Sequence, residues 1–127
     1  MRRMSFAMTK EQVRNQTKTV TRRRPETWID LVAGDLLQPV EKAQGLRKGE
    51  RQVLIGGPVQ VTSVWLERLD RAGPDEPRLE GFPDMILEDF LALERKANGC
   101  QNDDYVRRIE FEYCEPLREQ GGGGRWA

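Results

Sequence analysis

A short run of cationic and hydroxyl side chains, from Lys18 to Arg24, is the part of this sequence best suited to chemistry. Its seven residues include four cations and two threonines. Arginine presents a planar fork of donors that matches a phosphate, and the pKa of lysine shifts readily on burial. The threonine hydroxyl can donate, accept or act as a nucleophile. The run is therefore a candidate for anion binding or catalysis, and a solvated basic turn is the alternative.

Charge is distributed unevenly along the chain. The 127 residues carry 21 basic and 21 acidic side chains. Residues 1–24 hold eight basic residues and one acidic residue, whereas residues 64–127 hold nine basic and fifteen acidic residues. A basic pole attracts a polyanion locally even when the protein is neutral, and pairing between the two halves of the fold is the alternative. Tight non-specific binding to duplex DNA would need a basic face over the whole domain.

The composition limits the chemistry further. The chain has no histidine, which excludes Ser-His and Cys-His catalysis within one chain and leaves Lys, Tyr, Cys and carboxylates. Cys100 and Cys114 are too few for a disulfide framework or a zinc site, so we expect reduced thiols, no metal and no cofactor. No apolar stretch approaches the roughly 20 residues of a membrane span, and the N-terminus lacks a secretory pattern. We therefore expect a cytoplasmic protein that does not enter a membrane.

Five segments have the composition or the alternation of β-strands. The run from Val59 to Leu66 is rich in β-branched residues. Residues 105–113 alternate apolar and polar side chains, as a half-buried strand does. Pro39 confines its strand to an edge or to a bulge. The predicted strands cover residues 5–8, 36–40, 52–55, 59–66 and 105–113.

Helices and a long loop are expected between these strands. A capping box that begins at Thr9 predicts a helix over residues 10–16. An apolar stripe at helical spacing predicts a second helix over residues 85–97, and residues 28–33 are expected to form a helical turn. Residues 70–83 hold three prolines and two glycines, which favours a long loop, and long loops are often functional. The stripe of the second helix consists of Ile86, Phe90, Leu93 and Ala97.

This order of elements predicts an α+β fold, a small and mostly antiparallel β-barrel of about five or six strands with helices covering its ends. Residues 1–116 are expected to form this domain, and the Gly-rich residues 117–127, which include Trp126, a flexible tail. The strands at 59–66 and 105–113 are expected at the centre. The side chains expected to be buried are Phe6, Val61, Phe90, Leu93, Ile109 and Phe111.

The basic run resembles the signature of the ASCH domain family, written G-x-K-x-x-T-x-R. Lys18, Thr21 and Arg23 match its Lys, Thr and Arg, while Gln16 stands where the family has glycine. The resemblance covers about residues 4–114 and is strongest to stand-alone ASCH proteins from bacteriophages and actinobacteria. Three further segments are similar to family motifs: Gly34-Asp35-Leu36-Leu37 at a strand entry, Glu80-Gly81-Phe82 before the second helix, and Arg108 to Tyr113 in the closing strand.

The resemblance implies a PUA-like β-barrel with a ligand cleft lined by the signature. The family is thought to bind RNA or nucleotides. Some members remove an acyl group from the exocyclic nitrogen of cytidine, and others have ribonuclease activity. In the amidohydrolases the signature Lys and Thr act with an acidic residue, and Lys18 and Thr21 take the first two positions here. Glu80 is our choice for the acid, and Asp84 and Glu88 compete with it.

The chemistry of these residues allows both a binding module and an enzyme. Lys18 can act as a base towards Thr21 or a water if burial and neighbouring arginines lower its pKa, and a carboxylate such as Glu80 can shuttle a proton. We therefore expect Lys18, Thr21 and Glu80 to converge on one cleft, with Arg23 beside them.

Binding of single-stranded RNA or a nucleotide at Lys18–Arg24 is the first hypothesis. The alternatives are an amidohydrolase acting on N-acylated cytidine and a ribonuclease. Duplex DNA is expected to bind less well, because no helix carries a basic face. Trp28 and Trp65 are both candidates for stacking on a base, and for Trp65, which lies inside a strand, packing in the core is favoured over stacking. The residues expected to contact nucleic acid are Lys18, Thr19, Thr21, Arg22, Arg23, Arg24 and Trp28.

Overall fold

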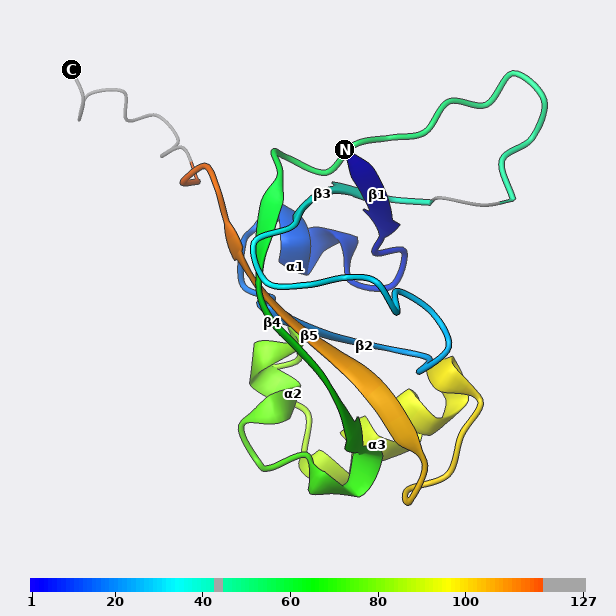
Figure 1. Ribbon diagram of the computed structural model, residues 1–127, viewed down its shortest axis with the longest axis vertical. Helices are drawn as coiled ribbons and strands as arrows, with labels where there is room; N and C mark the ends of the chain where they lie inside the picture. Colours follow the sequence, from blue (N-terminus) through cyan, green and yellow to red (C-terminus); the bar gives the residue numbers. More distant parts are fainter. Residues whose placement is uncertain (43–44, 118–127) are drawn as a thin grey trace.

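The computed structural model describes residues 1–42 and 45–117, and it shows an α+β fold around a five-stranded mixed sheet (Figure 1). The strand order is β1-β3-β4-β5-β2. The predicted flexible tail, apart from residue 117, lies outside the described residues. The elements are β1 (Arg2–Ser5), α1 (Lys10–Arg14), β2 (Val20–Arg23), β3 (Leu36–Val40), β4 (Val59–Arg68), the 3-10 helix η1 (Leu69–Arg71), α2 (Glu76–Leu79), α3 (Leu87–Asn98) and β5 (Tyr105–Tyr113).

The antiparallel pair of β4 and β5 forms the centre of the sheet. Its register runs from Val59 opposite Tyr113 to Arg68 opposite Tyr105, with an irregularity after Val61. The β-branched side chains of β4 favour extended backbone and pack well on a pleated surface. Both strands were predicted, and β4 continues beyond its predicted end.

The two edges of the sheet, β1 and β2, meet through a side chain. β1 pairs in parallel with β3, whereas the other strand pairs are antiparallel. Backbone pairing among the described residues does not close the sheet into the predicted barrel, because β1 and β2 remain edge strands. Arg23 Nη2, at the end of β2, donates a hydrogen bond of 2.7 Å to the carbonyl oxygen of Ser5, at the end of β1. This hydrogen bond links the two edge strands.

Several short predicted elements differ from the structure. β1 precedes the strand predicted at 5–8, because its pairing with β3 sets its position. The predicted capping box is not formed, since the side chain of Thr9 makes no capping hydrogen bond. Residues 28–33 form turns and not a helical turn, and residues 52–55 contribute only an isolated bridge to β3.

The loop predicted at 70–83 contains two short helices, η1 and α2. Pro77 lies in the first turn of α2, where its missing N–H has no helical partner to lose. Because α2 is present, Glu80 lies at its C-terminal end and is held by secondary structure. α3 agrees closely with the helix predicted at 85–97, and it ends before Gly99, whose φ of 62° is left-handed.

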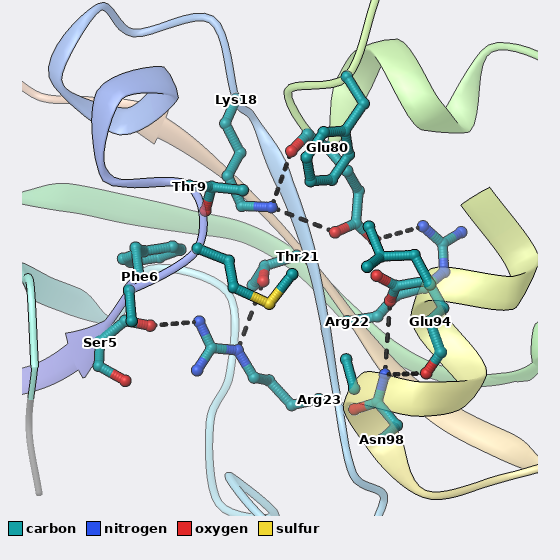
Figure 2. A pocket seen from close by; sticks show the side chains of 15 residues that line it. Ser5, Phe6, Thr9, Lys18, Thr21, Arg22, Arg23, Glu80, Glu94 and Asn98 are labelled. Carbon is teal, nitrogen blue, oxygen red and sulfur yellow. Dashed lines mark hydrogen bonds and ion pairs between the residues drawn. The ribbon is translucent and has the colours of Figure 1, made fainter. Parts of the chain in front are cut away.

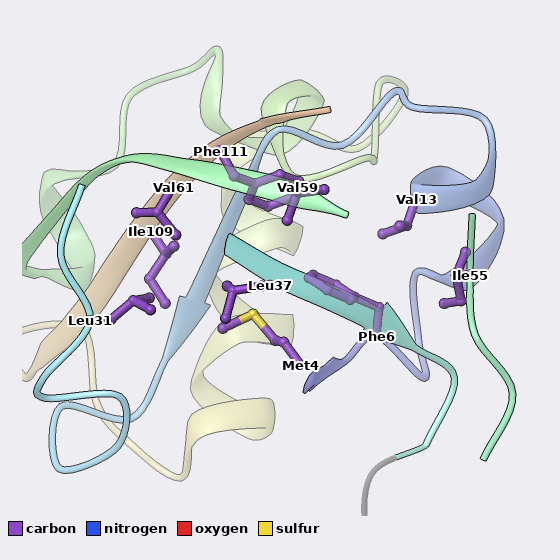
Figure 3. Close-up of a cluster of buried hydrophobic side chains, with 10 residues drawn as sticks. All are labelled: Met4, Phe6, Val13, Leu31, Leu37, Ile55, Val59, Val61, Ile109 and Phe111. Atoms are coloured by element: carbon purple, nitrogen blue, oxygen red, sulfur yellow. The ribbon is translucent and has the colours of Figure 1, made fainter. Parts of the chain in front are cut away.

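The hydrophobic core is formed by side chains from four strands, α1 and the adjoining loops (Figure 3). Removal of these apolar surfaces from water is the main favourable term in folding. The predicted burial of Phe6, Val61, Phe90, Ile109 and Phe111 is confirmed. The core cluster consists of Met4, Phe6, Val13, Leu31, Leu37, Ile55, Val59, Val61, Ile109 and Phe111.

Some side chains expected in the core are more exposed. Trp65 is 43% exposed, and the guanidinium of Arg108 lies 4.7 Å from its ring centroid. Leu93 is half-buried, and Ile86 and Ala97 are exposed. The predicted stripe of α3 is therefore wrong at its ends: Ile86 precedes the helix as its N-cap, and Ala97 faces a cleft and not the core.

The helices lie at different ends of the central strand pair. α2 and α3 lie beside one end of β4 and β5, and α1 lies towards the other (Figure 1). Phe90, on α3, packs near β2, because its ring centroid lies 5.5 Å from the guanidinium carbon of Arg22. Within the described residues, every helix is too short or too polar to cross a bilayer.

Candidate functional site

A cleft of about 240 Å³ lies between the segment after β1, the basic run and α3. Figure 2 shows polar side chains entering it from the region around β2, from the end of α2 and from α3. Apolar side chains, including Phe82 and Leu93, complete its walls. The polar residues on which the following argument depends are Lys18, Thr21, Arg23, Glu80, Glu94 and Asn98.

Lys18 enters the cleft from the segment just before β2. Its carbonyl oxygen accepts a hydrogen bond of 2.6 Å from the hydroxyl of Tyr113, which ties the segment to β5. Lys18 Nζ donates to the carbonyl oxygen of Glu80 at 2.9 Å and to Glu80 Oε1 at 3.1 Å. Burial lowers the pKa of Lys18, although the charge of Glu80 opposes this effect. A buried lysine of this kind releases its proton more readily than a surface lysine.

Glu80 is held in place by the turn that follows α2. Gly81 has a φ of 100°, which favours glycine, and a Cβ there would lie 2.8 Å from Cγ of Gln12. The glycine therefore allows this turn to pass close to α1 and Lys18. Glu80 lines the cleft, whereas Asp84 and Glu88, the competing candidates for the acid, are exposed and outside it.

Arg22 lies in a buried network of ion pairs. Its Nη1 donates to Glu80 Oε2 at 2.8 Å, and its Nη2 donates to Glu76 Oε1 at 2.6 Å. Arg108 Nε bonds the same oxygen of Glu76 at 2.8 Å. Burial acts to lower the pKa of Arg22, but Glu80 and Glu76 together raise it. The predicted contact between Arg22 and a phosphate would require these ion pairs to break.

Arg23 differs from Arg22 because it has no acidic partner. Its Nη2 bonds Ser5, its Nε donates to Thr21 Oγ1 at 3.4 Å, and its guanidinium lies 5.1 Å from the ring centroid of Phe6. Within the described residues, no carboxylate forms an ion pair with it. Burial lowers the pKa of Arg23. Arg23 is half-buried, and a partly desolvated cation without a counter-ion is unfavourable, so this part of the cleft suits an anion or a developing negative oxygen.

Glu94, on α3, is a buried acid that we did not predict. It is 6% exposed and lines the cleft. Its Oε1 accepts a long hydrogen bond of 3.4 Å from Asn98 Nδ2. Burial, followed by the nearby charge of Glu80, raises the pKa of Glu94 to about 8. The sequence signal was its position one helical turn after Phe90, which places an acid on the buried face of the helix.

The raised pKa of Glu94 makes stability depend on pH. Between the ordinary value of 4.5 and about 8, the folded protein holds a proton on Glu94 that the unfolded chain releases. The contribution of Glu94 to the free energy of unfolding is therefore complete below pH 4.5 and is lost as the pH rises through 8. Between these values the free energy of unfolding falls with a slope that approaches about 1.4 kcal/mol per pH unit. Glu94→Gln is expected to remove this slope in urea unfolding at pH 5.5, 6.5 and 7.5. The exposed Asp89→Asn on the same helix is the control, and parallel profiles for Glu94→Gln and the wild type would contradict the assignment.

Three residues predicted to bind nucleic acid lie outside the cleft. Thr19 is half-buried, and its backbone N–H donates to the carbonyl oxygen of Leu79 at 2.8 Å. Arg24 is exposed. Trp28 packs against the hydrophobic core, and the guanidinium of Arg2 lies 4.4 Å from its ring centroid. The structure thus brings together Lys18, Thr21, Arg22, Arg23 and Glu80, but not these three.

The described residues also contain no group of three or more His, Cys, Asp or Glu side chains placed to hold a metal ion. The thiols of Cys100 and Cys114 are free. The groups of the cleft that can take part in chemistry are the amine of Lys18, two guanidinium groups, two carboxyls, and the hydroxyls of Ser5, Thr9 and Thr21.

Comparison with known proteins shows a shared fold. No family model matches the sequence, and no curated protein matches it. The crystal structure of protein EF3133 from Enterococcus faecalis V583, of the family model DUF984, is similar with a TM-score of 0.54 and 14% sequence identity. The match covers 87% of this chain and 74% of that chain. At this sequence identity the likeness shows a shared fold and carries no statement about function.

Proposed function

We propose that the cleft binds an N-acylated cytidine and hydrolyses the amide on its exocyclic nitrogen. The observation that carries this proposal is the buried amino group of Lys18, which is held by Glu80 in the same cleft as the hydroxyl of Thr21. Lys18, Thr21 and Arg23 occupy the positions that resemble the Lys, Thr and Arg of the ASCH signature. This arrangement now favours amide hydrolysis over the binding module, which was the first hypothesis from the sequence.

The size and lining of the cleft support a small ligand. The cleft volume of about 240 Å³ lies just below the usual range of ligand pockets, which starts at roughly 300 Å³. This space suits a base or a nucleoside and not a folded nucleic acid. The apolar side chains of Phe82 and Leu93 provide surface for the faces of a base, and the polar groups contact its edge or its acyl group.

The residues divide the reaction between them. Lys18, in its neutral form, removes a proton from Thr21 or from a water, and the resulting oxygen attacks the acyl carbon. Arg23 stabilises the negative charge that develops on the carbonyl oxygen. Both carboxyl oxygens of Glu80 are already bonded, to Lys18 and to Arg22, so Glu80 positions the base and does not carry the proton to the leaving nitrogen.

The test is the release of cytidine from cytidine acetylated on its exocyclic amine. We expect turnover by the wild type and a loss of about 10²–10⁴-fold in Thr21→Ala, because a positioned hydroxyl is removed. Thr21→Ser should keep most of the activity. Thr17→Ala is the matched control, because Thr17 is exposed and lies outside the cleft.

Absence of turnover by the wild type over a panel of acyl groups would refute the amidohydrolase. The binding module would then be the better proposal, and the unpaired charge of Arg23 favours it because it suits a phosphate. Binding of cytidine 5′-phosphate and of labelled single-stranded RNA, measured at two salt concentrations, would test that function. Cleavage of the same RNA would report ribonuclease activity.

A further inference from the structure

We propose that Glu94 donates the proton to the exocyclic nitrogen as the amide bond breaks. This inference rests on the amide hydrolysis proposed above and assigns the step that Glu80 cannot perform. Glu94 reaches the cleft from α3, whereas Lys18 and Thr21 reach it from the segment around β2 (Figure 2). The base and the proton donor therefore belong to different elements of the fold.

The two carboxyl groups of the cleft have different partners. Glu80 forms ion pairs with Lys18 at 3.1 Å and with Arg22 at 2.8 Å, so both of its oxygens are occupied. Glu94 forms no ion pair within the described residues, and the one hydrogen bond that its carboxyl group makes there is the long contact from Asn98. Its Oε2 has no protein partner in the part of the chain that the structure describes. Glu94 thus has an oxygen free to meet a ligand.

The surroundings of Glu94 favour its protonated form. The charged groups that face it are Glu80 after α2, Lys18 before β2, and Arg22 and Arg23 on β2, while Asn98 is its polar neighbour on α3. Burial and Glu80 raise the pKa of Glu94 to about 8, against the opposing effect of the three cations. At neutral pH it therefore holds a proton beside a carboxylate that is paired with cations. Two carboxyl groups in such different environments commonly divide the roles in acid–base catalysis.

The proposed step balances with water as the co-reactant. As the bond between the acyl carbon and the nitrogen breaks, its electron pair stays on nitrogen, which takes the proton of Glu94. Cytidine leaves with a free amine, and Glu94 becomes a carboxylate. The proton that Lys18 removed from the nucleophile returns to Glu94 through solvent. If water attacks, the acyl group leaves directly as the carboxylic acid. If Thr21 attacks, the acyl-Thr21 ester is then hydrolysed by a water that Lys18 deprotonates, which releases the acid and restores the hydroxyl. The net reaction in both cases is addition of one water across the amide.

The experiment compares Glu94→Gln with the wild type on two substrates. We expect about 10²–10⁴-fold slower hydrolysis of acetylcytidine, because its amine must be protonated to leave. The second substrate is 4-nitrophenyl acetate, and the activity that is lost in Lys18→Met identifies its hydrolysis at the same site. This activity should differ by only a few fold between Glu94→Gln and the wild type, because a nitrophenolate leaves without a proton. The fall in kcat/KM of the wild type near pH 8 should be absent from the residual activity of the variant. Asp89→Asn, exposed on the same helix, should match the wild type.

The outcomes separate this inference from the function on which it rests. An inert wild type would overturn both the amidohydrolase and the donor. If the wild type is active and Glu94→Gln is equally active, only the assignment of Glu94 as the proton donor is overturned. The same holds if the fall in kcat/KM near pH 8 is unchanged in that variant. Carbon-13 NMR of labelled glutamate provides a readout without substrate: a carboxyl that titrates near pH 8 should be present in the wild type and absent from Glu94→Gln. Its presence in both proteins would also overturn the assignment.

Discussion

Replacement of Lys18 by methionine is expected to lower kcat/KM for acetylcytidine by about 10²–10⁴-fold, the usual loss when a positioned acid–base group is removed. Methionine fills much of the volume of the lysine stem but cannot accept a proton. Lys18→Arg should be equally inactive, because a guanidinium keeps its charge and cannot act as a base. Release of cytidine at saturating and at low substrate would separate the effect on kcat from that on KM.

The control for Lys18 is Lys10→Met, which removes an exposed cation on α1 outside the cleft. It should retain the activity of the wild type. Circular dichroism and thermal melting establish that the Lys18 variants are folded. If the folded Lys18→Met protein loses no more than about threefold of the wild-type activity, the loss is far smaller than expected for an acid–base group. That result would show that Lys18 is not the base.

Replacement of Glu80 by glutamine is expected to lower the free energy of unfolding by about 3–5 kcal/mol, the usual cost of breaking a buried ion pair. The carboxylate of Glu80 pairs with Lys18 and Arg22, and the side chains of all three residues are at most 3% exposed. The neutral amide leaves Lys18 without a counter-ion and Arg22 with Glu76 alone on its other nitrogen. Urea unfolding monitored by circular dichroism measures the difference.

Two further variants test the cause of this loss. Asp89→Asn neutralises an exposed carboxylate and should change the stability by less than about 0.5 kcal/mol. The double variant Glu80→Gln/Lys18→Met removes both partners of one pair and should recover part of the loss. Equal stability of Glu80→Gln and the wild type would mean that the buried pairs contribute little to folding.

Local sequence patterns were sufficient for the elements with strong periodicity. The β-branched run of β4 and the alternation of β5 predicted the central pair, because strand preference and burial of one face act in the same direction there. The strand predicted at 5–8 was displaced, since the register of β1 depends on its partner β3. The closed barrel was predicted from the element order and the family resemblance, but closure depends on pairing between edge strands, which no local pattern specifies.

The site residues that belong to a sequence motif were predicted. Those that only the fold brings close to the motif were missed. Lys18, Thr21 and Arg23 lie within a few residues of one another, and Glu80 was chosen because it precedes Gly81. The burial of Arg22 depends on acidic residues that lie far away in the sequence. Glu94 belongs to a helix whose apolar stripe was assigned to the core, and no motif in the sequence marks the acid beside that stripe.

The position of β2 at the edge of the sheet has a consequence for synthesis of the protein. β2 pairs with β5 alone, and residues 24–104 separate the two strands in the sequence. During translation the basic run leaves the ribosome early and has no strand partner until β5 has been made, so its cations stay hydrated until then. Tyr113, which fixes the backbone at Lys18, arrives later still. The cleft is therefore expected to be completed in the last stage of folding, and the proposed ligand should bind only once β5 is in place.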